Sequence, residues 1–99
     1  MKIDGISQST GAERVVAVEA ERGRLSVAVT DRSGAIVMGR AVLPPEGLMT
    51  ILVEKPLGSQ TVAEGVTVEV RRNEVWLVVG QADAAVGLDD LMDAVGSTA

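Results

Sequence analysis

The sequence lacks cysteine and histidine, and its 99 residues include no phenylalanine or tyrosine. Without cysteine there can be no disulfide, no zinc–thiolate centre and no thiol nucleophile. Without histidine the chain lacks the commonest proton shuttle near neutral pH and the commonest metal ligand. These absences predict a protein that is not an enzyme and that binds neither a metal nor a cofactor.

Basic residues are also scarce, since 9 Lys and Arg face 14 Asp and Glu and give a net charge of −5. That balance opposes non-specific binding to nucleic acid or to an anionic membrane. The first ten residues lack the apolar core of a signal peptide, and no apolar run approaches the length of a membrane span. We therefore expect a soluble cytoplasmic protein that does not contact a membrane and for which nucleic acid is an unlikely partner.

The apolar residues that are present, 46% of the chain, are nearly all aliphatic, and Trp76 is the only aromatic side chain. Branching at Cβ makes valine well suited to strands, so the many valines favour a sheet. A chain of this length is expected to form one domain.

Alternating apolar residues predict a strand hairpin in the first half of the chain. Its expected inward residues are Val16, Val18 and Ala20, followed by Leu25, Val27 and Val29. Gly23 suits the intervening turn because glycine accepts positive φ. A third strand is expected over 35–42 and a loop over 56–65. Residues 46–54 have apolar residues at helical spacing after Pro45, which favours a helix, although their branched residues leave a strand as the alternative.

The same order of elements is predicted in the second half. The expected inward residues are Val66, Val68 and Val70, then Val75, Leu77 and Val79. A short third strand over 82–86 precedes a helix over 87–96, whose Leu88, Leu91, Met92 and Val95 share one face. Asp89 and Asp90 suit the positive end of the helix dipole, and Gly96 is expected just beyond its last turn.

The two halves align at an offset of fifty positions, with Val16, Val18 and Glu19 matching Val66, Val68 and Glu69. This predicts a duplication of a β-β-β-α unit, over 14–55 and 62–96, although two unrelated Val-rich hairpins could also align this well. Both units would lie in one α+β domain over 14–99, an antiparallel sheet with two helices on one face. Residues 1–13 would be an N-terminal tail or an edge strand.

Duplicated modules of strands and helices are similar to the repeated units of DNA sliding clamps and to small bacterial hairpin proteins that pair their sheets into dimers. The first resemblance implies a nucleic-acid accessory factor. However, Asp89, Asp90 and Asp93 on the second helix would repel phosphates, so we assign the chain to no family. Helix capping and the helix dipole explain these aspartates better than a cation site does.

Trp76 is expected on the outward face of its strand, opposite Val75 and Leu77. The predicted interface residues on this back face of the sheet are Trp76, Val78, Val15, Ala17 and Ala28. Exposed apolar patches usually bind a partner, and tryptophan is enriched in interface hot spots. The alternative is that the sheet curls, or that the N-terminal segment covers Trp76, and buries it within the monomer.

Four arginines lie at or beside the two predicted hairpin turns, namely Arg22, Arg24, Arg71 and Arg72. If the hairpins lie side by side, these residues form a possible contact for an anion. Charges at hairpin tips more often serve solubility.

These features favour a small non-catalytic protein that acts by assembly. The expected partner is a second copy of the chain, with a dimer favoured, or another protein. The alternatives are a small-molecule-binding module with its ligand between the two units, and a clamp-like nucleic-acid accessory factor.

Overall fold

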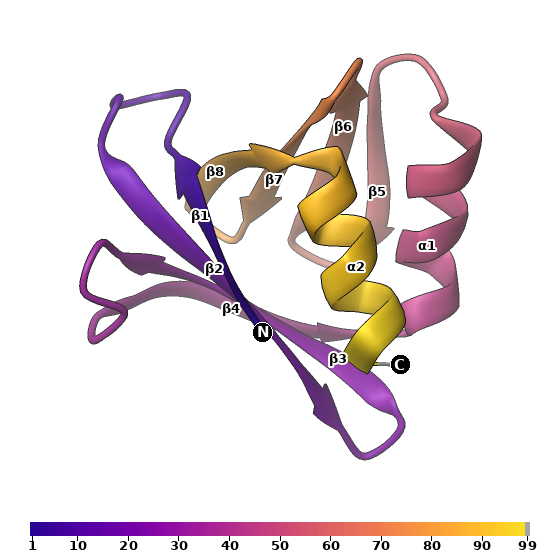
Figure 1. The fold of residues 1–99 in the computed structure, drawn as a ribbon, viewed down its shortest axis with the longest axis horizontal. Helices are drawn as coiled ribbons and strands as arrows, with labels where there is room; N and C mark the ends of the chain where they lie inside the picture. Colours follow the sequence, from indigo (N-terminus) through magenta and orange to yellow (C-terminus); the bar gives the residue numbers. More distant parts are fainter. Residues whose placement is uncertain (99) are drawn as a thin grey trace.

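The structure is a computed structural model that describes residues 1–98. Eight antiparallel strands form one sheet in the order β4-β3-β2-β1-β8-β7-β6-β5. The elements are β1 (Lys2–Ile6), β2 (Glu13–Glu21), β3 (Arg24–Asp31), β4 (Val37–Leu43), α1 (Pro45–Glu54), β5 (Ser59–Ala63), β6 (Val66–Arg71), β7 (Glu74–Val79), β8 (Ala82–Gly87) and α2 (Leu88–Thr98). Four strands followed by a helix therefore occur twice, as a first half and a second half of the chain (Figure 1).

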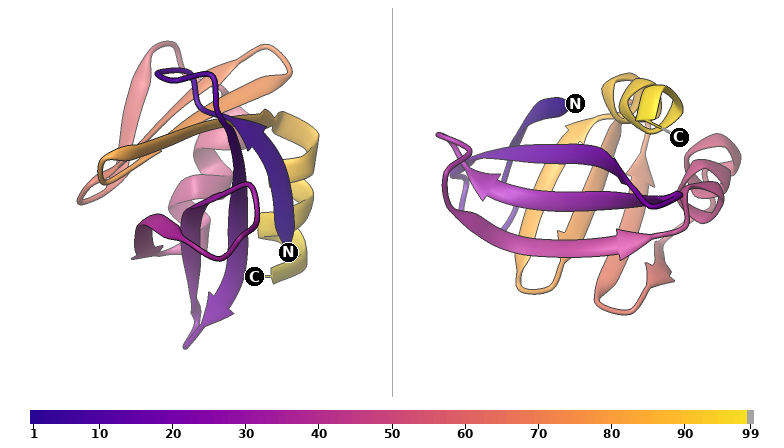
Figure 2. Two further views of the ribbon diagram at one scale, coloured as in Figure 1. Left: turned by 90° about the vertical axis from the view of Figure 1, so that its left-hand side faces the viewer. Right: turned by 90° about the horizontal axis from the view of Figure 1, so that it is seen from below.

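The sheet curls into a nearly closed barrel, and this corrects the predicted fold. β3 and β4 both contact β7, although several strands separate them in the sheet order. Strands of the two halves cross at a steep angle, and the helices lie at the ends of the barrel instead of covering one face of the sheet (Figure 2). The prediction was wrong because the apolar faces of the twisted halves pack on each other, which leaves no open face for the helices.

Gly39 marks the place where β4 approaches the second half. A Cβ atom at this position would lie 2.1 Å from the carbonyl oxygen of Val79 and 3.3 Å from the Cβ of Ala82. Only glycine therefore lets the backbone of β4 come this close to β7, and this contact helps to close the barrel.

The alternation of apolar residues predicted most of the core correctly. Ten of the twelve expected inward residues are buried, namely Val16, Val18, Leu25, Val27, Val29, Val66, Val68, Val75, Leu77 and Val79. Ala20 is exposed and Val70 half-buried, because each lies one residue before the end of its strand, β2 or β6, next to the hairpin turn. Gly23 has the expected positive φ, 79°.

Each half has one strand more than the predicted β-β-β-α unit. β1 is not an edge strand, because it pairs with β2 along its length and with β8 at Ile6 and Ala85. β5 lies within residues 56–65, for which a loop was predicted, and it forms one edge of the sheet. Its polar sequence gave no alternation to detect, since an edge strand needs few buried side chains.

Residues 45–54 form a helix, which excludes the alternative of a strand. Leu48 and Leu52 are its buried residues, and Lys55 ends it in the left-handed conformation. α2 buries Leu88, Leu91, Ala94 and Val95, and it continues through Gly96, which was expected to lie beyond it. Neither of the two helices within residues 1–98 has the length and apolar content needed to cross a bilayer.

Candidate functional site

Asp83 is a buried carboxylate on β8 that accepts five hydrogen bonds. Its Oδ1 accepts from the hydroxyls of Ser7 and Ser9, both at 2.7 Å. Its Oδ2 accepts from the backbone N–H groups of Gln8 at 2.8 Å and Ser9 at 3.2 Å, and from Nε1 of Trp76 at 2.9 Å. The loop between β1 and β2 is thereby attached to the second half of the chain.

The hydrogen bonds also determine the charge of this group. Burial by itself raises the pKa of Asp83, but donation by Ser7, Ser9, Trp76 and the Gln8 N–H lowers it by more in total. The pKa therefore lies far below its ordinary value, and the side chain stays ionised. With its lone pairs occupied and its proton affinity low, Asp83 is unsuited to general acid or base chemistry.

The sequence analysis overlooked Asp83, although a signal was present. It is the only charged residue in the strand "ADAAVG", which is otherwise made of apolar residues and glycine. A charge in a buried strand requires polar partners, so such a residue indicates a hydrogen-bonded network.

Trp76 lies on the outer face of the second half and is half-buried. The guanidinium carbon of Arg71 lies 4.8 Å from the centre of its ring, within the range of a cation–π interaction. Arg71 also forms an ion pair with Glu69, which lies on the same face and directly opposite Trp76 on β6. The ring is therefore partly covered by side chains of its own sheet, while its N–H contacts Asp83.

The other predicted interface residues do not form one continuous patch with Trp76. Val78 is its half-buried neighbour on β7, whereas Val15 and Ala17 lie on β2 and Ala28 on β3. β1 and β8 separate the two groups in the sheet. Ala28 is itself buried, so this group offers little apolar surface to a partner.

The four arginines predicted to contact an anion are also divided. Arg22 and Arg24 lie at the β2–β3 turn, and Arg71 and Arg72 at the β6–β7 turn. These turns lie on opposite sides of the molecule (Figure 1). The condition for a shared basic edge, hairpins side by side, is therefore not met.

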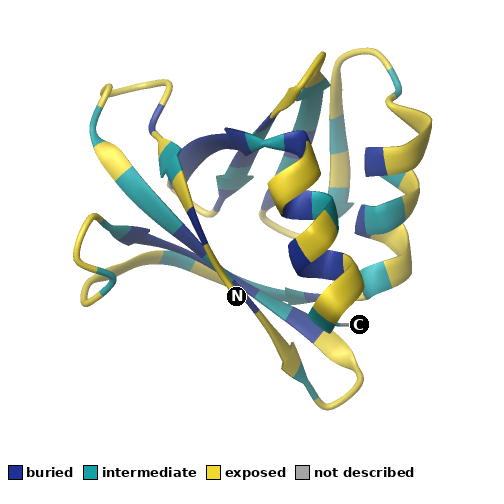
Figure 3. Cartoon of the chain, viewed as in Figure 1, coloured by how far each residue is buried: buried dark blue, intermediate teal, exposed yellow. Residues whose placement is uncertain are grey.

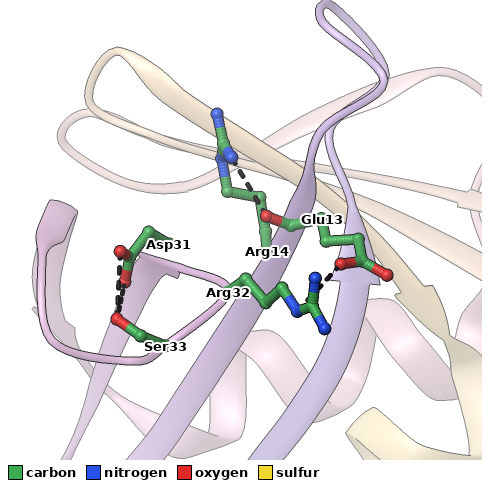
Figure 4. Close-up of polar contacts among 5 residues, drawn as sticks. All are labelled: Glu13, Arg14, Asp31, Arg32 and Ser33. Atoms are coloured by element: carbon green, nitrogen blue, oxygen red, sulfur yellow. Dashed lines mark hydrogen bonds and ion pairs between the residues drawn. The ribbon is translucent and has the colours of Figure 1, made fainter.

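The start of β4 forms an exposed apolar segment that the sequence analysis did not identify as a surface. Ile36, Val37 and Met38 are exposed by 61%, 57% and 44%. Exposed residues continue from the preceding turn into the strand (Figure 3). In this turn Asp31 accepts hydrogen bonds from the Ser33 hydroxyl (Figure 4) and from the Ile36 N–H, so the segment has a defined position. Its signal in the sequence was a run of apolar residues next to a turn.

A groove of about 550 Å³ lies along the line where β1 of the first half meets β8 of the second. We refer to it as the seam groove. Its lining comes from five parts of the chain, namely residues 4–6 of β1, 13–15 of β2, Arg32 in the turn after β3, 73–74 at the start of β7 and 85–87 of β8. Figure 4 shows Arg32 paired with Glu13 and the Arg14 guanidinium turned away from that pair.

Within residues 1–98, no group of three or more acidic side chains is placed to hold a metal ion. No protein-family model matches the chain, and the searches of curated proteins and of solved structures found no match. Function is therefore inferred from the chain's own residues.

Proposed function

We propose that the protein is a small non-catalytic interaction protein that assembles with a second copy of itself through the exposed start of β4. The observation that carries this proposal is the exposure of Val37 and Met38 on an edge strand and of Ile36 directly before it. β4 pairs only with β3, so alternate backbone N–H and C=O groups along it face away from the sheet. Apolar side chains beside unpaired backbone favour the addition of another strand.

The opposite edge of the sheet supports the choice of β4. β5 has Ser59, Gln60 and Thr61 and an irregular register after Thr61. Polar side chains and bulges protect sheet edges from pairing. The start of β4 also has a bulge, but its side chains are apolar and no charge interrupts them before Arg40, which is paired with Glu21.

The test is the mass of the protein in solution, measured by size-exclusion chromatography with light scattering. We expect a dimer that Val37→Lys converts to a monomer, because a charge at the edge opposes strand pairing. Val53→Lys is the matched control, since Val53 is exposed to a similar extent, 59%, but lies on α1. A monomeric wild-type protein, or a dimer that survives Val37→Lys, would contradict the proposal.

A small-molecule-binding module is the second candidate, and the seam groove favours it. The groove lies between the two halves, as that hypothesis requires, and its volume falls in the range of ligand sites. Trp76 is the cross-strand neighbour of Ala85, a lining residue of the groove, so the fluorescence of Trp76 across a panel of metabolites tests this candidate.

A further inference from the structure

The two helices lie side by side and run in opposite directions, so the start of α1 lies beside the end of α2 (Figures 1 and 2). A hollow of about 370 Å³ between them is lined by Pro45, Glu46, Met49 and Thr50 of α1 and by Val95 of α2. We refer to this hollow as the helix groove. It shares no lining residue with the seam groove.

The same pattern of residues flanks the helix groove on each helix. Residues at positions i, i+3, i+4 and i+7 share one side of a helix. In α1 they are Glu46, Met49, Thr50 and Val53, and in α2 they are Asp89, Met92, Asp93 and Gly96. A Cβ atom on Gly96 would lie 3.9 Å from Cε of Met49, so these two sides face each other.

The base of the helix groove is apolar and accessible. Met49 and Met92 are only partly buried against the core, and Val53 is 59% exposed. Gly96 is exposed within α2, although glycine lowers the stability of a helix relative to alanine. Its missing side chain leaves space beside Met49. Because methionine adapts its shape to different apolar neighbours, this surface suits an inserted apolar residue.

The edges of the helix groove are negatively charged. Every charged residue of α1 and α2 is acidic and exposed, namely Glu46, Glu54, Asp89, Asp90 and Asp93. Within residues 1–98, none of them belongs to an ion pair. Among the described residues, no basic side chain lines the hollow. Lys55, at the end of α1, is the nearest basic residue in the chain, and this single cation leaves an excess of negative charge.

The helix dipole explains only part of this acidic surface. Glu46, Asp89 and Asp90 lie in the first turns of their helices, where negative charge is favourable. Asp93 lies beyond the first turn of α2, and Glu54 is the last residue of α1, where negative charge is unfavourable. The remaining charge is therefore available to attract a cationic partner.

We propose that the helix groove binds an amphipathic helix of another protein, whose apolar side contacts Met49, Val53 and Met92 and whose Lys and Arg residues flank that side. Charge complementarity selects this occupant, because the helices of a second copy are themselves acidic and would be repelled. α1 has 10 residues and is about 15 Å long, which matches roughly three turns of a bound helix. α1 follows the end of β4, whereas the surface proposed for self-association lies at the start of β4.

The probe is a labelled synthetic helix of about 18 residues with leucines on one side and lysines on the other. Fluorescence anisotropy compares it with a peptide that has Glu in place of Lys and with a peptide of the same composition in scrambled order. The wild-type protein should bind the Leu/Lys helix at least roughly tenfold more tightly than the scrambled peptide. It should not bind the glutamate peptide.

Glu46→Gln combined with Asp93→Asn should weaken binding of the Leu/Lys helix roughly tenfold, because both edges of the groove lose charge. Asp4→Asn combined with Glu64→Gln is the matched control, since it changes the net charge by the same amount. Both control residues are exposed and lie outside the helices. The control should change the affinity by less than about twofold.

A third variant separates loss of the groove from loss of the fold. Gly96→Leu should prevent binding by filling the groove, while the protein stays at least as stable as wild type, because leucine favours a helix over glycine. Val53→Lys should weaken binding of the Leu/Lys helix but leave the expected dimer intact. Val37→Lys should have the opposite effects, so this proposal and the proposed self-association can fail separately.

The proposal is overturned if the Leu/Lys helix does not bind or if the scrambled peptide binds equally well. It is also overturned if the control pair of variants weakens binding as much as the groove pair, which would show non-specific attraction to an acidic protein. Binding retained by Gly96→Leu would contradict it as well.

Discussion

Asp83 lies on β8, yet four of the five hydrogen bonds that it accepts come from the loop between β1 and β2. Trp76 supplies the fifth. A buried carboxylate is stable only when such donors replace water, and each donor is fixed in position by the bond it makes. This residue therefore joins the beginning of the chain to the second half, and it also sets the orientation of the only tryptophan.

Gly39 is a second residue with a structural role, because the backbone of β7 lies directly against it. We expect Gly39→Ala to lower the free energy of unfolding by about 1–3 kcal/mol, because its Cβ would collide with the Val79 carbonyl. Gly47→Ala is the opposite case, since nothing lies within 4 Å of its Cβ position and it lies in α1. That variant should gain about 0.5–1 kcal/mol from the higher helix propensity of alanine.

Urea denaturation of both glycine variants measures these changes. If Gly39→Ala were as stable as wild type, the close approach of β4 to β7 would not be needed to close the barrel.

At the scale of elements, the β2–β3 and β6–β7 hairpin turns share a positive φ at their first residue. Arg22 and Arg72, fifty positions apart, both have φ of 51° at the start of their turns. Most residues other than glycine avoid this left-handed region, so the coincidence supports the proposed duplication of the chain. Each half of the chain has four strands and a helix, one strand more than the predicted unit.

Arg22→Asn should stabilise the protein by about 0.5–1 kcal/mol, because asparagine tolerates the left-handed conformation and Asn-Gly is the preferred tight hairpin turn. Thermal unfolding should show a rise in Tm of a few degrees. Arg24→Asn is the control, since Arg24 lies in β3 and has no positive φ. A Tm that is unchanged or lower in Arg22→Asn would show that the arginine side chain makes a contribution that the turn geometry does not explain.

At the scale of the whole molecule, stability should depend on acid pH. Burial raises the pKa of Asp83, but the hydrogen bonds that it accepts lower this pKa by a larger amount. Hydrogen bonds from the Ile36 N–H and the Ser33 hydroxyl lower the pKa of Asp31. At pH values between the lowered pKa of the folded chain and the ordinary pKa of the unfolded chain, the unfolded chain binds more protons than the folded chain. The stabilisation is therefore complete above the unfolded value, about 3.9, and is lost as pH falls below it.

We expect Asp83→Asn to remove most of this acid dependence. The variant should also lose about 3 kcal/mol of unfolding free energy near neutral pH, because the NH2 group of the amide is a donor and cannot accept the hydrogen bonds that a carboxylate oxygen accepts. Denaturation at a series of pH values measures both effects. A wild-type stability that is flat from neutral pH to well below 3.9 would contradict the assignment of a lowered pKa to Asp83.

Some features could be predicted from the sequence because they depend on near neighbours. The alternation around Val16 and Val66 gave the inward faces of the hairpins, and the helical spacing around Leu48 and Leu91 gave both helices. Backbone preferences placed the turn at Gly23. The outward position of Trp76 followed from the same period of two, although its role in an interface remains a prediction.

Other features were decided only by the tertiary structure, since they bring together residues that are distant in the chain. Ser7 and Asp83 are 76 positions apart, and no local pattern indicates that one satisfies the other. The seam groove depends on where the ladder between β1 and β8 stops, and the exposure of Val37 depends on which strand lies at the edge. The sequence by itself determined the faces of strands and helices through local periodicity, whereas the curling of the sheet determined which faces meet, because burial depends on contacts between the two halves.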